Sequence, residues 1–166
     1  MTGLVEWFMN ALRGLSGELV ALIISMVPLL ELRGGLLAAS LLGVDILKAV
    51  PLCIIGNVIP VPFILWFITP IFTAMKKTKL FRPLVEKIEK KAMSKSDRIE
   101  KGYFWGLVLF VGIPLPGTGA WTGALIAALL DIPMKKAFPA ILLGILVATV
   151  IMSAVSYGLL GALLGH

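Results

Sequence analysis

Two long apolar stretches of the chain are each interrupted by residues that break helices. The first interruption reads Pro28-Leu-Leu-Glu-Leu-Arg-Gly-Gly35, and the second reads Pro114-Leu-Pro-Gly-Thr-Gly119. Proline removes a backbone hydrogen-bond donor, and glycine gains unusually large conformational freedom when a helix unwinds. We therefore expect each stretch to form two short helices that meet at a bend, rather than one continuous helix.

The chain around these two breaks repeats itself. Residues at equal distances from the breaks match, namely Pro28 with Pro114, Leu29 with Leu115, Ala38 with Ala124, and Asp45-Ile46 with Asp131-Ile132. An insertion of two residues after this point continues the match, with Pro51 on Pro139 and Gly56 on Gly144. The sequence therefore predicts two structurally related halves.

The composition is that of a protein that lies within a membrane. Hydrophobic residues make up 59% of the 166 residues and charged residues only 14%, whereas a soluble domain is about a quarter charged. Six segments are almost continuously apolar: 19–30, 36–42, 50–73, 103–113, 120–130 and 138–164. This pattern predicts an all-α integral membrane protein with a single membrane domain.

Several other classes of protein are not indicated. The net charge of +6 lies mostly in one loop, so it gives no reason to expect a nucleic-acid partner. The single Cys53 excludes an internal disulfide and a cysteine-based metal site. Motifs for nucleotide phosphates, zinc or an acyl-transfer serine are missing, so we expect no cofactor, no metal and no enzymatic activity. A cleaved signal peptide is not expected either.

We expect four parts along the chain. Residues 1–16 are predicted to form an interfacial helix, 17–74 the first repeat, 75–101 a basic amphipathic linker helix, and 102–166 the second repeat. Each repeat would contain one re-entrant helical hairpin, over 19–42 or 103–130, and one full transmembrane helix, over 49–73 or 137–164. A kink is expected at Asn57–Pro62, because two prolines lie there.

The distribution of lysine and arginine predicts the orientation. Short basic loops face the cytoplasm, which places residues 75–101 there. If residues 103–130 re-enter rather than cross, Lys135 and Lys136 remain on the same side. Each repeat then crosses the membrane once, so the two halves have opposite orientations, as in the inverted repeats of secondary transporters. We expect a multi-pass protein of the inner or plasma membrane.

Glu31 and Arg33 are the strongest candidates for a functional site, because they lie in the first break. A charge in the hydrocarbon core costs about 2.5–3.5 kcal/mol on insertion scales, so such residues are paired, solvated in a cavity or neutralised. A structural reading is an ion pair that fixes the bend. A functional reading gives Glu31 a role in binding protons or a cation and Arg33 a role in binding an anion.

The second break offers backbone groups rather than charges. Helix N-termini and freed N–H groups near Pro116 and Gly119 suit a phosphate or a carboxylate. The predicted site residues on this side are Pro114, Pro116, Gly117, Thr118, Gly119 and Trp121. Asn57, a polar group beside the kink, is a further predicted site residue. The alternative is that the glycines only allow the two hairpins to cross closely.

Two further patterns have structural explanations. Asp45 and Asp131 precede the transmembrane helices, and we expect them to be N-caps. Ala154, Gly158, Gly161 and Gly165 form a face of small residues on the last helix, which indicates close helix packing within the chain or in a dimer.

Three motifs together resemble one family. They are Pro-Leu-Leu-Glu-Leu-Arg-Gly-Gly at 28–35, Gly-Asn-x-x-Pro-x-Pro at 56–62, and Gly-x-Pro-Leu-Pro-Gly-Thr-Gly-Ala-Trp-Thr-Gly at 112–123. With them the chain resembles the small multidrug export protein family, which looks related to the DedA (SNARE-associated, VTT) superfamily. That resemblance implies paired re-entrant hairpins and movement of lipids, and its embedded glutamate maps onto Glu31. The arginines of the superfamily's second hairpin have no counterpart at Gly117, Gly119 and Ala120.

The residues and the resemblance lead to three functional hypotheses. The first is a transporter or flippase for a small amphiphile, such as a phosphate-bearing lipid carrier, with protons coupled through Glu31. The second is a proton-coupled exporter of lipophilic cationic drugs. The third, of a different class, is a membrane scaffold that transports nothing. Membrane lipids and a second copy of the chain are the expected partners.

Overall fold

The computed structural model describes residues 2–77, 83, 102–115, 117–130 and 132–159. Throughout these ranges the regular structure is helical, as the sequence predicts. The predicted linker helix over 75–101 lies outside the described residues, apart from Met75–Lys77 at the end of a longer helix and Pro83. Pro116 and Asp131 also lie outside them.

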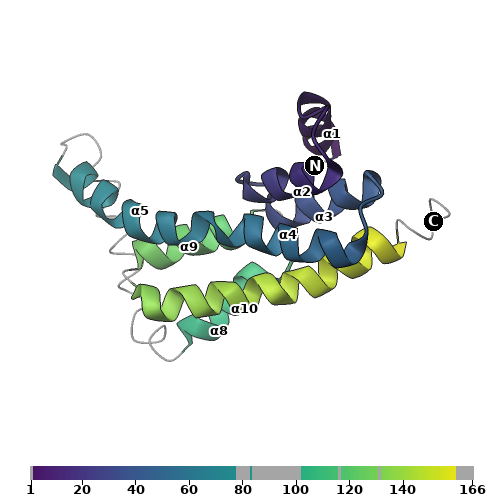
Figure 1. Ribbon diagram of the computed structural model, residues 1–166. Helices are drawn as coiled ribbons and strands as arrows, with labels where there is room; N and C mark the ends of the chain where they lie inside the picture. Colours follow the sequence, from purple (N-terminus) through teal and green to yellow (C-terminus); the bar gives the residue numbers. More distant parts are fainter. Residues whose placement is uncertain (1, 78–82, 84–101, 116, 131, 160–166) are drawn as a thin grey trace.

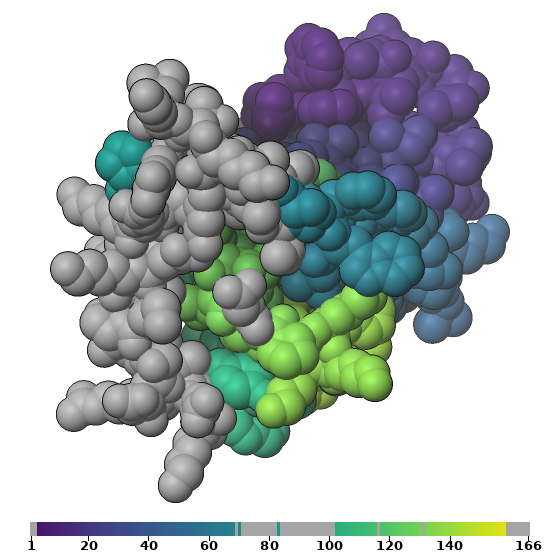
Figure 2. Space-filling view, turned by 90° about the vertical axis from the view of Figure 1, so that its left-hand side faces the viewer, coloured from purple at the N-terminus to yellow at the C-terminus, as the bar shows by residue number. Residues whose placement is uncertain are grey.

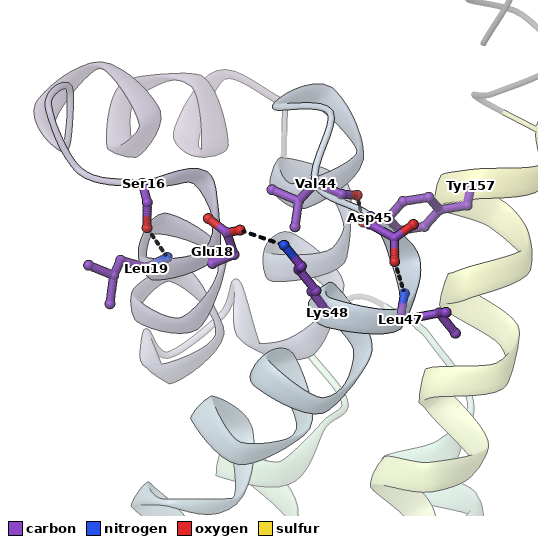
Figure 3. Close-up of polar contacts among 8 residues, drawn as sticks. All are labelled: Ser16, Glu18, Leu19, Val44, Asp45, Leu47, Lys48 and Tyr157. Atoms are coloured by element: carbon purple, nitrogen blue, oxygen red, sulfur yellow. Dashed lines mark hydrogen bonds and ion pairs between the residues drawn. The ribbon is translucent and has the colours of Figure 1, made fainter.

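The first half begins with a short helix and a helical hairpin and continues into a long helix. Its elements are α1 (Thr2–Ala11), α2 (Gly17–Met26), α3 (Glu31–Leu41), α4 (Ile46–Val58) and α5 (Pro60–Lys77). The Oδ1 atom of Asp45 accepts a hydrogen bond of 2.9 Å from the backbone N–H of Leu47 (Figure 3). The predicted N-cap role of Asp45 is therefore confirmed.

The boundary between α4 and α5 lies at the predicted kink. Ile59 separates the two helices, and Pro60 is the first residue of α5. Proline is well tolerated at a first helical position, because that position needs no backbone donor. The break therefore occurs where the two prolines of this segment begin.

The second half repeats this order of elements. It contains α8 (Tyr103–Gly112), α9 (Ala120–Leu129), α10 (Met134–Ser153) and the π-helical turn η1 (Ala154–Leu159). Helices α2 and α8 have bounds that differ by 86 residues (17 and 103, 26 and 112). From the ends of α3 and α9 onward the difference is 88 residues. Helix α3 ends at residue 41 and α9 at 129, and α4 begins at residue 46 and α10 at 134.

This register corrects the one read from the sequence. The two inserted residues lie within the second break, between the hairpin helices, and not after Asp45-Ile46. The structural counterpart of Asp45 is Pro133, which is the N-cap residue of α10. Runs of small apolar residues align almost equally well when one run is shifted by two residues. The ends of the helices, in contrast, agree with only one alignment of the two halves.

Glycine contacts support the corrected register. A Cβ atom on Gly56 of α4 would lie 2.9 Å from the Cβ atom of Ser25, and one on Gly144 of α10 would lie 2.6 Å from the Cβ atom of Val111. The two glycines are 88 residues apart, and Ser25 and Val111 are 86 apart. Each long helix therefore contacts the first hairpin helix of its own half at equivalent positions.

The two long helical segments run antiparallel along the molecule (Figure 1). Helices α4 and α5 run in one direction, and α10 runs beside them in the other, with α9 packed on α5 and α8 on α10. Two helical segments are long and apolar enough to cross a membrane, Ile46–Ile68 with mean hydropathy 2.1 and Met134–Gly158 with mean hydropathy 2.5. They agree with the two predicted transmembrane helices.

The hairpin helices are too short to cross a membrane individually. Helices α2, α8 and α9 have 10 residues each, which corresponds to about 15 Å, half of a hydrocarbon core about 30 Å thick. Large apolar side chains also cover much of the outer surface, including Trp66, Val150 and Leu47 at 67%, 72% and 82% exposure. Such a surface is typical of a protein that contacts lipid.

Helix α1 covers the hairpin of the first half. Its Val5 is fully buried in a cluster with Val20 and Ile24 of α2 and with Leu30 and Ala38. The opposite side of α1 exposes Trp7 by 62%. This helix therefore closes the groove between the two helices of the first hairpin.

Candidate functional site

The breaks of the two halves contact each other, and Glu31, Arg33 and Gly119 are buried at the contact. Where α2 leads into α3, the backbone takes positive φ angles at Leu29 (72°) and at Glu31 (50°), the first residue of α3. A non-glycine residue in this region of φ carries strain, and such residues concentrate at functional sites. The break between α8 and α9 includes Gly117 and Gly119 at positive φ angles of 79° and 142°.

Glu31 binds the first backbone amides of α9. Its carboxylate accepts hydrogen bonds of 3.0 Å from the N–H groups of Ala120 and Trp121, and the residue is only 5% exposed. The first N–H groups of a helix have no partner within the helix and favour negative charge. A side chain at the start of α3 therefore acts as the cap of a helix 90 residues further along the chain.

Gly119 leaves the space that the Glu31 carboxylate occupies. A Cβ atom at residue 119 would lie 2.0 Å from the Oε2 atom of Glu31, and the φ angle of 142° disfavours any other residue. In the corrected register, residues 31 and 119 are equivalent positions of the two halves. The two breaks thus meet at equivalent positions, one with a carboxylate and the other with no side chain.

Arg33 binds the opposite end of the second break. Its guanidinium donates to the carbonyl oxygen of Leu115, to that of Ile113 at 3.3 Å, and to the hydroxyl of Thr118 at 2.9 Å. Ile113 is the C-cap residue of α8, where carbonyl groups lack helical partners. Arg33 is 7% exposed, so its charge is buried against these oxygen atoms.

Trp121 makes the reciprocal contact to the first half. Its Nε1–H group donates a hydrogen bond of 3.2 Å to the carbonyl oxygen of Met26, the last residue of α2. Arg33 and Trp121 are equivalent positions, 88 residues apart. Each half therefore binds the end of the other half's first hairpin helix. The residue that does so lies two positions after Glu31 in the first half and two positions after Gly119 in the second.

The structure brings together most of the predicted site. Glu31 contacts Gly119 and Trp121, and Arg33 contacts Thr118. Pro114 is half-buried and Gly117 exposed within the same break.

Asn57 lies elsewhere on the chain, two residues before the boundary of α4 and α5. It is 2% exposed, and its Oδ1 atom accepts no hydrogen bond from the part of the chain that the structure describes. Sequence reasoning named it as a polar group beside the kink.

The sequence predicted backbone donors at a helix N-terminus of the second break, and the N–H groups of Ala120 and Trp121 are such donors. The groups that sequence reasoning missed are the backbone carbonyl groups of Met26, Ile113 and Leu115. Both charges of the first break are thus bound to polar backbone groups of the second half. We call this contact between the two breaks the crossing, and it joins the halves by charge-assisted hydrogen bonds.

These features define a helical integral membrane protein whose two halves meet at broken hairpins. A family model described as "Putative small multi-drug export protein" matches residues 31–151. The match covers most of the chain, from Glu31 through both breaks and into α10, and the chain belongs to this family. No curated protein and no solved structure gives a significant match.

Proposed function

We propose that the protein exports small amphiphilic compounds across the cell membrane, and that the crossing of the two breaks is the part that rearranges. The family suggests an exporter. The antiparallel long segments and the matching helix bounds support an inverted repeat with two re-entrant hairpins. In this arrangement the linker over 75–101 is cytoplasmic. The proposed transport involves no enzymatic activity.

The observation that carries the proposal is the binding of the Glu31 carboxylate to the N-terminal amides of α9. Two N–H groups at a helix N-terminus form an anion-binding site. In this conformation an anion of the protein itself occupies that site. Export then requires that Glu31 leave, and uptake of a proton would remove the charge that holds it there.

An anionic headgroup can take the place that Glu31 vacates. It would accept the same hydrogen bonds from Ala120 and Trp121 and would lie near the guanidinium of Arg33. Phosphate pairs well with arginine and with helix N-termini. We therefore favour a phosphate-bearing amphiphile, such as a lipid carrier, as the substrate, exchanged against protons through Glu31.

A lipophilic cationic drug is the second candidate, and the family description names multi-drug export. In this version Glu31 alternates between the amides of α9 and the cationic drug, while Arg33 stays bound to the carbonyl groups of the second break. Arg33→Ala separates the two versions. It abolishes movement of a phosphate-bearing lipid, whereas it spares or raises movement of a cation.

Proteoliposomes provide the direct test. We expect wild type to move a fluorescent short-chain phosphatidic acid faster than protein-free vesicles, with a rate that depends on a proton gradient. Glu31→Gln should reduce this movement to background, because the amide cannot exchange a proton. The surface variant Glu18→Gln is the matched control and should behave as wild type. Equal background rates in wild type and Glu31→Gln, for both the lipid and a cation such as ethidium, would instead favour a scaffold.

A homodimer is part of the proposal, because a chain of 166 residues is small to enclose a pathway alone. The small residues of the last helix, including Ala154 and Gly158, are the proposed contact. Cross-linking of the purified protein in lipid nanodiscs tests this.

A further inference from the structure

An apolar groove lies between the helices of the second hairpin, at the ends remote from the crossing. It has a volume of about 320 Å³ and is lined by one face of α8, by the end of α9 and by the residues that follow α9, with side chains from Tyr103, Leu107, Phe110, Ile126, Leu130 and Ile132. Gly106 also lines it, and a Cβ atom added there would meet no atom within 4 Å. Figure 2 views the molecule from this end, where α8, α9 and α10 come together.

The first half shows what covers the equivalent surface there. Gly106 corresponds to Val20, Phe110 to Ile24, and Ile126 to Ala38 in the corrected register. Val20, Ile24 and Ala38 are packed in one buried cluster with Val5 of α1. In the first half, apolar residues of α1 thus cover the surface between the two hairpin helices. In the second half, the glycine at residue 106 leaves more space on the equivalent surface.

The charges beside the two grooves also differ. In the first half the Nζ atom of Lys48 lies 3.8 Å from the Oε1 atom of Glu18 (Figure 3). The counterpart of Lys48 is Lys136, but the counterpart of Glu18 is Phe104, which carries no charge. Lys136 lies over the ring of Tyr103, 5.7 Å from its centroid, and Tyr103 lines the groove. Lys135, beside it, is exposed.

We propose that the groove between α8 and α9 binds an acyl chain of an anionic phospholipid, whose phosphate lies at Lys135 and Lys136. The wall is apolar, as an acyl chain requires, and its volume is within the range of ligand sites. The lysines at the start of α10 supply the complementary charge for a headgroup at the membrane surface. The site is distinct from the crossing at Glu31 and does not depend on the proposed export.

Titration of lipid into the detergent-solubilised protein, followed by native mass spectrometry, tests the proposal. Wild type should bind dioleoyl phosphatidylglycerol more tightly than dioleoyl phosphatidylcholine. Gly106→Leu should weaken the binding of both lipids, because its side chain fills the groove, and Gly3→Leu, also in open space, should not. The double variant Lys135→Gln/Lys136→Gln should lose the preference for phosphatidylglycerol. Loss of each lysine should lower the affinity for phosphatidylglycerol about fivefold.

Three results would overturn the proposal. The first is equal affinity for phosphatidylglycerol in wild type, Gly106→Leu and the double lysine variant. The second is a loss in Lys48→Gln equal to that in the double lysine variant. The third comes from a photo-cross-linking amino acid placed at residue 106 in nanodiscs of phosphatidylglycerol. Attachment of phospholipid supports the proposal, whereas attachment only to the peptide 78–101 would assign the groove to the chain itself.

Discussion

Arg33 and Trp121 occupy equivalent positions of the two halves, and each donates hydrogen bonds to the end of the other half's first hairpin helix. Arg33 binds the carbonyl groups of Ile113 and Leu115, and Trp121 binds that of Met26. Between them, Glu31 of one half meets Gly119 of the other. The halves share this framework but differ in charge, because arginine and glutamate in the first half face tryptophan and glycine in the second.

Loss of the Trp121 hydrogen bond should destabilise the protein without removing its apolar packing. Trp121→Phe leaves the carbonyl oxygen of Met26 without this donor in a half-buried place, which costs about 1–3 kcal/mol. Thermal unfolding in detergent would measure this as a lower midpoint. Trp105→Phe is the control, because Trp105 is 62% exposed, and an equal shift in both variants would contradict the role of the hydrogen bond.

Gly119 should tolerate no side chain while Glu31 is present. The Cβ atom of Gly119→Ala would lie 2.0 Å from the Oε2 atom of Glu31 and would sit on a backbone with a φ angle of 142°. We expect a loss of at least about 3 kcal/mol, from strain and displacement of the carboxylate together. Gly106→Ala is the control, and it should be neutral or stabilising by up to about 1 kcal/mol, since it is helical with open space around it.

The two contributions at Gly119 can be separated by a double-mutant cycle. Glu31→Ala removes the clashing carboxylate, so the cost of Gly119→Ala should be smaller in that background. Strictly additive free energies of unfolding would mean that the two residues do not interact.

Arg33→Lys should be markedly less stable than wild type, although the charge is kept. A guanidinium reaches the carbonyl groups of Ile113 and Leu115 and the hydroxyl of Thr118 at once, whereas an ammonium group is a compact donor that cannot span them. The expected loss is about 1–3 kcal/mol, the usual cost of leaving a buried polar group unsatisfied. Lys48→Arg, at an exposed position, provides the control in the same unfolding assay, and full stability of Arg33→Lys would argue against the observed geometry.

Gly56→Ala and Gly144→Ala should cost similar amounts if the halves are structurally equivalent. Added Cβ atoms would lie 2.5 Å from the carbonyl oxygen of Leu22 and 2.6 Å from the Cβ atom of Val111, respectively. Overpacking of this kind costs about 1–3 kcal/mol, because the helices must move apart. Unfolding of both variants beside Gly3→Ala, where space is open, would check this, and a neutral Gly144→Ala would contradict the register.

Much of the fold follows from local patterns in the sequence. The proline and glycine breaks separate α2 from α3 and α8 from α9, and the prolines after Asn57 separate α4 from α5. Asp45 caps α4 because an aspartate before an apolar run satisfies the first free N–H groups locally. The topology relative to the membrane, the substrate and the dimer stay predictions.

The site was only partly predictable for a physical reason. Glu31 and Arg33 stood out because charge is costly in an apolar segment, but apart from the hydroxyl of Thr118 their partners are backbone groups. The predicted helix N-terminus pointed to the amides of Ala120 and Trp121. Every residue carries a carbonyl group, so no pattern of side chains marks those of Ile113 and Leu115 as binding partners. The repeat register failed for a related reason, since the extra two residues lie in the break, where little side-chain pattern remains.

The sequence by itself determined an apolar helical chain with two related halves and a charged first break, because periodicity, helix breakers and the cost of buried charge are local properties. Only the tertiary structure decided that the two breaks cross, that Glu31 caps α9, and that Arg33 and Trp121 exchange contacts between the halves. These contacts join residues 80 to 95 positions apart along the chain, and they depend on the packing of the long helices that brings the two breaks together.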